Sequence, residues 1–408
     1  DGWLCDRGRY NIGFYNSPER VLQPMYKKNG TFVQIGWDDA FALWSKALHA
    51  ARDRSGAAGL GAIGGGRLTN EEAYLLQHVF RGFGTSNLDW RAGRQRQATP
   101  GKNGGTYEEL ESAQAIVVAG GSVEELAPVM WLRVRKARLR GGATLIRESD
   151  PQRARDAVPQ NAERVALIWD GVDPSVGSAF ARAFDGAPGL RTYIASEQSN
   201  ARGAEAMGML PNAGPGYRAD ASGRNAQQML EDAAAGKLDA LALFGVNPAR
   251  NAADPQAASQ ALAAVPFLVV SELFLTETAQ LATLVLPAKG PFEKFGSTID
   301  IAGQALDVRP SLDAPSGVLS DLEMLIGLAD ALGVDLPTQE ALERAVALNA
   351  AAAVDTFGFA SGLFQADANP NAPAAPRILS GGGTWRNDPT VQPLDARRDE
   401  ALATAEAG

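Results

Sequence analysis

The stretch Ala115-Ile116-Val117-Val118-Ala119-Gly120-Gly121-Ser122 decides the fold. Its apolar residues run without a polar interruption and end at two glycines. An unbroken apolar strand is buried on both faces, which happens when helices cover a parallel sheet on both sides. Because the order strand, glycine turn, helix repeats before and after this stretch, the sequence predicts an α/β protein.

Other short apolar runs are expected to form further strands of this kind, at 59–64, 144–146, 165–169, 192–194, 240–244 and 267–270. Amphipathic patterns predict helices between them and two more near the end, at 321–332 and 340–352. We divide the chain into a small β-rich segment that ends in a helix (1–53), a first α/β block (54–155), a second α/β block with a β-loop at 291–310 (156–335), and a helix followed by an extended tail (336–408).

The composition excludes several classes of protein. The 408 residues include one Cys and two His, too few for a zinc site, an iron–sulfur cluster or an internal disulfide built by this chain alone. A formal net charge of -9 argues against a nucleic-acid binder. No apolar run reaches the length of about 18 residues that a membrane span needs, so we expect no direct membrane insertion. The first residue is Asp1, and we expect the chain to begin partway into a longer polypeptide, the alternative being loss of the start Met.

Three glycine turns follow predicted strands, at Gly61-Ala62-Ile63-Gly64-Gly65-Gly66, Gly120-Gly121-Ser122 and Gly245-Val246-Asn247-Pro248. Turns at this position hold phosphate groups in nucleotide-binding α/β proteins, because free backbone N–H groups converge there. None matches the dinucleotide fingerprint or the Walker loop. The alternative is that the turns need glycine for backbone reasons alone.

Two basic segments are candidates for binding. A loop carries Arg91, Arg94, Arg96 and Lys102, and it fits a phosphate or an acidic partner. The alternative is a solvated loop or a salt-bridged contact with another subunit. The predicted helix 129–140 alternates basic and apolar residues, a pattern typical of arginines that extend outward from a helix packed on a sheet.

Side chains with acid–base chemistry have structural explanations. His49 and His78 lie in predicted helices without a motif partner, and we expect both to be structural. The acidic pairs at 71–72, 108–109 and 124–125 fall at helix starts, where the helix dipole favours carboxylates. The sequence therefore predicts no catalytic residue.

Cys5 stands in a charged, turn-rich segment, Leu4-Cys5-Asp6-Arg7-Gly8-Arg9-Tyr10. A lone Cys is most often an inert core residue; the alternative is the last ligand of a cluster whose other cysteines lie upstream. The segment resembles the end of the iron–sulfur segment of molybdopterin oxidoreductases. Further blocks resemble the same family in the correct order, at 37–40, 245–248, 271–279, 282–287 and 293–298. This resemblance implies two Rossmann-like parallel-sheet blocks of the molybdopterin oxidoreductase type.

Within the family, the stretches 67–77, 87–89, 132–137 and 203–211 resemble the large iron–sulfur subunit, or G subunit, of NADH-quinone oxidoreductase, respiratory complex I. Catalytic relatives carry a Cys, selenocysteine or Ser metal ligand before the next strand, and formate dehydrogenases add a His. The matching stretch 90–105 contains no Cys, His or Ser. The resemblance therefore implies no catalytic residue, no cofactor-binding residue and no molybdenum cofactor in this chain.

The same resemblance implies a mainly structural portion of the complex I peripheral arm, on the cytoplasmic side of a bacterial inner membrane, with other peripheral-arm subunits as partners. Cys5 is then the expected fourth ligand of one [4Fe-4S] cluster completed by upstream residues, and other clusters belong to a preceding region. The alternatives are a Mo or W bis-pterin oxidoreductase subunit, such as a formate dehydrogenase, and a stand-alone nucleotide-binding α/β protein.

Overall fold

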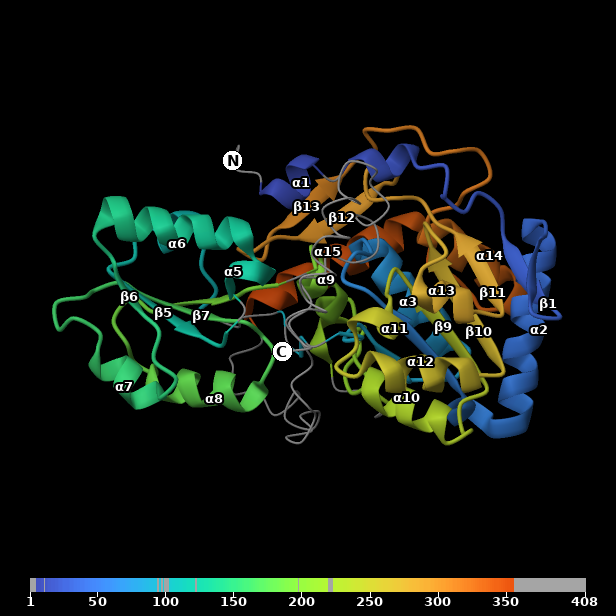
Figure 1. Ribbon diagram of the computed structural model, residues 1–408, viewed down its shortest axis with the longest axis horizontal. Helices are drawn as coiled ribbons and strands as arrows, with labels where there is room; N and C mark the ends of the chain where they lie inside the picture. The colour runs from blue at the N-terminus through green and yellow to red at the C-terminus, as the bar shows by residue number, and fades with distance from the viewer. Residues whose placement is uncertain are drawn as a thin grey trace, which may run out of the picture.

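The computed structural model describes residues 5–355, apart from 11, 94, 97, 99–102, 122, 197 and 219–222. Two lobes lie side by side, each built on its own sheet (Figure 1). The predicted α/β fold with parallel-sheet blocks is confirmed. Within the described residues, no helix combines the length and the apolar character needed to cross a bilayer.

The larger lobe is built on a sheet with the strand order β2-β1-β11-β10-β9-β3-β4. The strands from β11 to β4 run parallel, and β1 and β2 add an antiparallel edge. The bounds are β1 (Met25–Lys28), β2 (Thr31–Gln34), β3 (Leu60–Gly64), β4 (Leu88–Asp89), β9 (Ala240–Phe244), β10 (Phe267–Glu272) and β11 (Leu284–Pro287).

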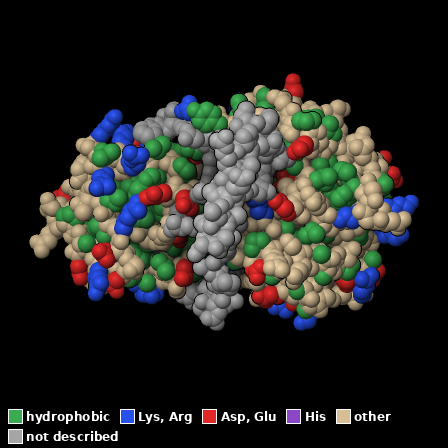
Figure 2. Space-filling model, in the orientation of Figure 1, with side chains coloured by type: hydrophobic (Ala, Val, Ile, Leu, Met, Phe, Trp, Pro, Cys, Tyr) green, Lys and Arg blue, Asp and Glu red, His purple; other side chains and the backbone are tan. Residues whose placement is uncertain are grey.

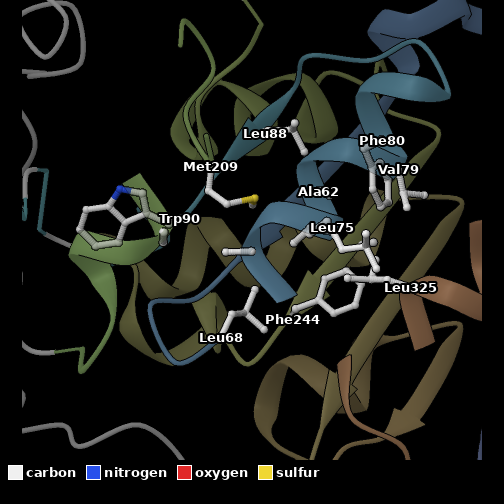
Figure 3. Packing of buried hydrophobic residues seen from close by; sticks show 14 of the residues in the cluster. Ala62, Leu68, Leu75, Val79, Phe80, Leu88, Trp90, Met209, Phe244 and Leu325 are labelled. Carbon is white, nitrogen blue, oxygen red and sulfur yellow. The ribbon is translucent and has the colours of Figure 1, made fainter. Parts of the chain in front are cut away.

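Helices cover both faces of this sheet, as the unbroken apolar strands predict. They are α2 (Trp37–Ser55), α3 (Asn70–Gly82), α9 (Ala201–Ala206), α10 (Ala226–Ala234), α11 (Pro248–Asn251), α12 (Pro255–Ala264), α13 (Glu277–Leu281), α14 (Asp321–Leu332) and α15 (Gln339–Asp355). The core between the sheet and α2, α3 and α14 contains Ala62, Phe244 and Leu325, with Leu75 and Phe80 of α3 (Figure 3). Helices α10 and α12 pack on the other face.

The smaller lobe is a parallel sheet with the order β6-β5-β7-β8, formed by β5 (Ala115–Ala119), β6 (Thr144–Ile146), β7 (Val165–Trp169) and β8 (Arg191–Ile194). Its helices are α4 (Tyr107–Glu111), α5 (Val123–Leu126), α6 (Pro128–Gly141), α7 (Pro151–Asp156) and α8 (Pro174–Ala183). One buried cluster joins the sheet to α4 and α6, and another joins it to α7 and α8.

The two sheets do not follow the boundaries that we expected at 54–155 and 156–335. Strands β3 and β4 of the first expected block belong to the larger sheet, where β3 pairs with β9 from the second block. The smaller sheet takes β5 and β6 from one block and β7 and β8 from the other. Because these apolar strands resemble one another in composition, local patterns cannot say which of them pair.

Short elements lie near the start of the described chain and around the β-loop. The remaining short elements near the start are α1 (Asp6–Tyr10), η1 (Gly13–Asn16) and η2 (Gly56–Gly59), and η3 (Pro215–Tyr217) follows α9. Asn29 and Gly30 both have positive φ in the β1–β2 hairpin, the backbone that a tight two-residue turn requires. The β-loop expected at 291–310 is an antiparallel ribbon of β12 (Gly296–Ile299) and β13 (Ala305–Val308). The tail expected after α15 lies outside the described residues.

Helix α14 offers a matched test of the core. Leu328 is fully buried in the cluster on α2 and α3, whereas Ile326 of the same helix is 46% exposed. We expect Leu328→Ala to lower the free energy of unfolding by about 2–5 kcal/mol and Ile326→Ala to change it by less than about 1 kcal/mol. Urea unfolding followed by circular dichroism measures both, and equal effects would contradict this packing.

Candidate functional site

The candidate site is the crevice at the carboxyl ends of the two sheets, where ligands bind in open α/β folds. In the larger sheet β3 and β9 are neighbours, but the next strand after each lies on opposite sides: β4 lies beyond β3, and β10 lies beyond β9. The direction in which strands are added therefore reverses between β3 and β9. In the smaller sheet it reverses between β5 and β7. The glycine turns singled out in the sequence lie at these two reversal points.

The turn after β3 is occupied by the chain itself. The Gly66 N–H donates to Oε1 of Gln198, and the Gly66 carbonyl accepts a hydrogen bond of 2.6 Å from the Asn200 N–H. A Cβ on Gly66 would lie 2.7 Å from the backbone nitrogen of Ala201. Glycine is required here because the segment that leads into α9 rests directly on the turn.

The turn after β9 is likewise occupied by residues of the same chain. Asn247 accepts from the Thr278 hydroxyl at 2.7 Å, and its amide nitrogen donates to Glu277 at 2.8 Å. The Thr278 hydroxyl in turn accepts from the Ala249 N–H at 3.1 Å. A Cβ on Gly65 would lie 2.9 Å from the Gly245 carbonyl oxygen, so the two turns touch. These contacts bind α11 to α13.

A buried carboxylate fills the reversal point of the smaller sheet. Asp170, which follows β7, accepts hydrogen bonds of 3.1 Å from the N–H groups of Gly121 and Val172. Gly120 has a φ of +94°, and a Cβ there would lie 2.2 Å from Oδ2 of Asp170. A negative group at this position repels a phosphate that approaches the same N–H groups.

A cavity of about 230 Å³ lies where the two lobes meet, between β8, α6 and the β12–β13 ribbon. Sites for drug-sized ligands occupy about 300–1,000 Å³, so it is small. Its polar lining includes Tyr107, Ser199, Arg202 and Asp300. Arg202 is turned toward the ribbon, because its Nη1 donates to the Ile301 carbonyl at 2.7 Å. Burial raises the pKa of Tyr107, Arg133 opposes this shift and Asp300 adds to it.

A buried ionic cluster lies at the start of α3, close to the same crevice. Thr69 and Glu72 form a capping box, and the acidic pair at 71–72 lies at a helix start as predicted. The Glu72 carboxylate also accepts from Nζ of Lys294 at 2.6 Å, and Asp321 at the start of α14 lies on the other side of that ammonium group at 3.8 Å. No local pattern in the sequence marks Lys294 or Asp321 as buried.

The basic loop is turned inward where the structure describes it. Arg91 forms a buried pair with Asp89, with Nε 2.7 Å from Oδ1, and the same carboxylate accepts from the Ala226 N–H at the start of α10. Arg96 donates to the Arg91 and Gly93 carbonyls. Both arginines contact their own chain, an arrangement that the sequence did not predict, and Arg94 and Lys102 lie outside the described residues.

The histidines occupy structural positions. His49 packs edge-on against the Phe83 ring, with ring centroids 5.1 Å apart. His78 lies 2.8 Å from the Asp335 carbonyl oxygen through Nε2. Both are half-buried on helices, as the sequence predicted.

Helix α6 has a basic outer face. Arg135, Arg138 and Arg140 are exposed, and Figure 2 shows Lys and Arg side chains gathered on this lobe. The predicted outward arginines are confirmed at these three positions. Arg133, in contrast, is buried and pairs with Glu111 of α4.

Cys5 is half-buried and directly precedes α1. Across the described residues, no group of three or more His, Cys, Asp or Glu side chains is placed to hold a metal ion. The structure does not describe residues 1–4. The geometry therefore gives Cys5 no metal partner within the described chain, and its predicted role stays a prediction.

Comparison with known proteins finds a matching family model and several relatives. The family model for Molybdopterin oxidoreductase matches residues 20–167 and 171–331.

The G subunit of NADH-quinone oxidoreductase from Mycobacterium tuberculosis (strain CDC 1551 / Oshkosh) is 29% identical, over 94% of this chain and 55% of that protein. The protein of the same name from Streptomyces coelicolor is 26% identical, over 98% of this chain and 57% of that protein. The F420-dependent formate dehydrogenase subunit alpha of Methanocaldococcus jannaschii is 24% identical, over 82% of this chain and 65% of that protein. The chain thus spans just over half the length of its NADH-quinone oxidoreductase relatives.

Two solved structures share the fold. Acetylene hydratase from Pelobacter acetylenicus aligns with a TM-score of 0.57 and 14% identity, over 81% of this chain and 64% of that chain. A chain of the formyltransferase/hydrolase complex from Methylorubrum extorquens aligns with a TM-score of 0.52 and 14% identity, over 76% of this chain and all of that chain. At this identity the likeness concerns the fold alone.

The contact at Gly66 can be tested by adding a single methyl group. We expect Gly66→Ala to lower the free energy of unfolding by more than about 1 kcal/mol, because its Cβ meets backbone that cannot easily move. The control is Gly141→Ala at the end of α6, where the nearest atom lies 3.6 Å away. The control is expected to be neutral or stabilising by up to about 1 kcal/mol. If chemical denaturation finds the two variants equally stable, the segment at 198–201 does not rest on the turn.

Proposed function

The chain belongs to the molybdopterin oxidoreductase family, and from that premise we propose that it is part of the large iron–sulfur subunit, the G subunit, of a NADH-quinone oxidoreductase. The observation that carries the proposal is the match to relatives of that name along 94–98% of this chain. The complex would transfer electrons from NADH to quinone. This portion would lie in the peripheral arm, at the cytoplasmic side of a bacterial membrane, in contact with other subunits of that arm.

In this proposal the portion is mainly structural, and it binds no molybdenum cofactor. The residues at both reversal points do not fit a pterin dinucleotide. The N–H groups of Gly66 and Gly121, which would face its phosphates, donate instead to Gln198 and Asp170. The cavity of about 230 Å³ between the lobes is smaller than even a drug-sized site of about 300 Å³.

The ribbon contacts add support for a structural role. Residues 300–304 form the turn between β12 and β13. The carbonyls of Asp300 and Ile301 accept from Arg202 of α9, so this turn of the ribbon binds its own chain. The stretch 90–105 contains no Cys, His or Ser to ligate the metal as catalytic relatives do.

The alternative is a Mo or W oxidoreductase subunit such as a formate dehydrogenase. The relative from Methanocaldococcus jannaschii, named as a formate dehydrogenase subunit, favours it at 24% identity. This alternative requires a metal held without a Cys, His or Ser from 90–105. Metal content separates it from the leading proposal.

The metal test uses the full complex purified from its native membrane. We expect molybdenum and tungsten to lie far below one atom per chain in elemental analysis, because the turns that would hold the cofactor are filled by Gln198 and Asp170. A formate dehydrogenase carried through the same purification is the positive control. Stoichiometric molybdenum or tungsten would overturn the structural assignment and favour the alternative.

We also propose that Cys5 is the fourth ligand of one [4Fe-4S] cluster in the full-length subunit. A cluster of this kind needs four ligands, and the chain contains one cysteine. The remaining ligands would come from residues outside this sequence.

In the full-length subunit, Cys5→Ser is expected to remove about four iron atoms, one cluster's content, and one set of electron paramagnetic resonance signals. Asn16→Ala, an exposed change in the same segment, is the control and should leave iron unchanged. Unchanged iron and spectra in Cys5→Ser would show that Cys5 is not a ligand.

A further inference from the structure

Three buried ionisable side chains meet where α3, α14 and the segment before β12 come together. Glu72 of α3 is 0% exposed, and Lys294 and Asp321 are each 5% exposed. Nζ of Lys294 lies 2.6 Å from Oε2 of Glu72 and 3.8 Å from Oδ2 of Asp321. We call these three residues the lysine cluster.

The lysine cluster has more acidic groups than basic ones. With every group ionised, two carboxylates share one ammonium group and a net negative charge is buried. Glu272 of β10 adds a second acidic group toward Asp321, and the cation that faces Glu272 is the half-buried Arg67. Because an uncompensated buried charge is costly, the arrangement favours uptake of one proton.

The hydrogen bonds favour Asp321 over Glu72 as the group that takes this proton, because Lys294 bonds to Glu72 and not to Asp321. Oδ1 of Asp321 accepts from the Ser271 hydroxyl at 2.5 Å, whereas Oδ2 lies beyond hydrogen-bond distance from Lys294. In the Glu72 carboxylate, Oε2 accepts from Lys294 and from the Thr69 N–H, but Oε1 is buried without a partner among the described residues. Oε1 of Glu72 therefore lacks a donor among the described residues, and Asp321 lacks a cation at hydrogen-bond distance.

We propose that the lysine cluster is a proton-binding site, in which Asp321 is a neutral carboxylic acid in the lower part of the physiological pH range and releases its proton to water as the pH rises. The site is distinct from the reversal points and does not depend on the proposed function. It couples solvent pH to the junction of α3, α14 and the β12–β13 ribbon.

The electrostatic surroundings support this proposal. Burial, and next the charge on Glu72, raise the pKa of Asp321 to about 7, with a smaller contribution from Glu272, while Lys294 and Ser271 oppose the shift. Burial lowers the pKa of Lys294, but the charges of Glu72 and Asp321 outweigh this effect and raise it above its ordinary value, so Lys294 stays charged.

The neighbouring charged groups are engaged elsewhere. Glu71 accepts from Ser297 at the start of the ribbon. Glu323, on the same helix as Asp321, is exposed and pairs with Lys289 at 2.8 Å. Arg67 faces Glu272 and opposes the rise that burial causes in the pKa of Glu272. None of these groups supplies the missing donor.

The direct test is infrared spectroscopy of the full chain between pH 5 and 9. A buried carboxylic acid gives a resolved C=O stretching band, and we expect a component that disappears with a midpoint near pH 7, the value to which the pKa of Asp321 is raised. Asp321→Asn should remove this component. Asp307→Asn, a change at an exposed carboxylate of β13, should retain it. Absence of the component in the wild type, or its persistence in Asp321→Asn, would overturn the proposal.

A second variant keeps the test decisive if Asp321→Asn fails to fold. Glu72→Gln preserves the shape of the side chain and its bond to the Thr69 N–H, but removes the charge that raises the pKa of Asp321. The infrared midpoint should move to lower pH in this variant. An unchanged or higher midpoint would mean that Asp321 is not the group observed.

Stability gives an independent readout. The pKa of Asp321 is raised from 3.8 to about 7 in the folded chain, so the unfolded chain loses this proton first as the pH rises. The contribution of Asp321 to stability therefore falls between about pH 4 and 7 and is constant above that range. The urea midpoint of Asp321→Asn, relative to wild type, should rise from pH 5 to pH 8, and that of Asp307→Asn should not. A constant difference for Asp321→Asn would count against the proton site.

Discussion

The pairing of β3 with β9 is the constraint on which the rest of the structure depends. It joins Leu60–Gly64 to Ala240–Phe244 in parallel register, although some 180 residues separate them. The intervening chain must therefore leave the larger sheet after β4, form the smaller lobe and return through α9 and α10. The same pairing sets the turns at Gly65 and Gly245 against each other and creates the reversal point. The position of the crevice thus follows from one strand pairing.

At both reversal points the chain uses its own oxygen atoms where such folds usually receive a ligand. Buried N–H groups must be satisfied, and Gln198 and Asp170 accept from those of Gly66 and Gly121. A ligand could enter only by displacing these side chains and leaving their oxygens in need of new donors. The two glycine turns thereby serve to attach α9 and to order the loop after β7. These contacts are the physical argument for the structural role that we propose.

Local sequence patterns predicted the strands and the helices, because these elements, and the caps and turns that bound them, depend on neighbouring residues. Thr69 with Glu72 and Asn29 with Gly30 are examples whose geometry is set within a few positions. The partition into sheets could not be predicted, because several similar apolar strands compete for the same partners. The occupants of the turns were missed for a related reason. Gln198 and Asp170 are ordinary loop residues until the fold brings them to a glycine N–H, and no spacing in the chain encodes that contact.

Buried ion pairs determine how the ribbon segment is placed. Glu293 pairs with Arg20 at 2.5 Å, and its neighbour Lys294 pairs with Glu72, so two adjacent residues reach partners more than 200 positions away. Such pairs are weak evidence for stability, because desolvation offsets most of their attraction. Breaking one is different: a single buried charge left alone costs about 3–5 kcal/mol. A shift of this segment by one residue would place a like charge against one of the two partners and a phenylalanine, Phe292 or Phe295, against the other, so that both ion pairs would be lost. The alternating pair Glu293-Lys294 therefore fixes the register in which the segment before β12 docks against α3, and with it the place of the ribbon between the lobes.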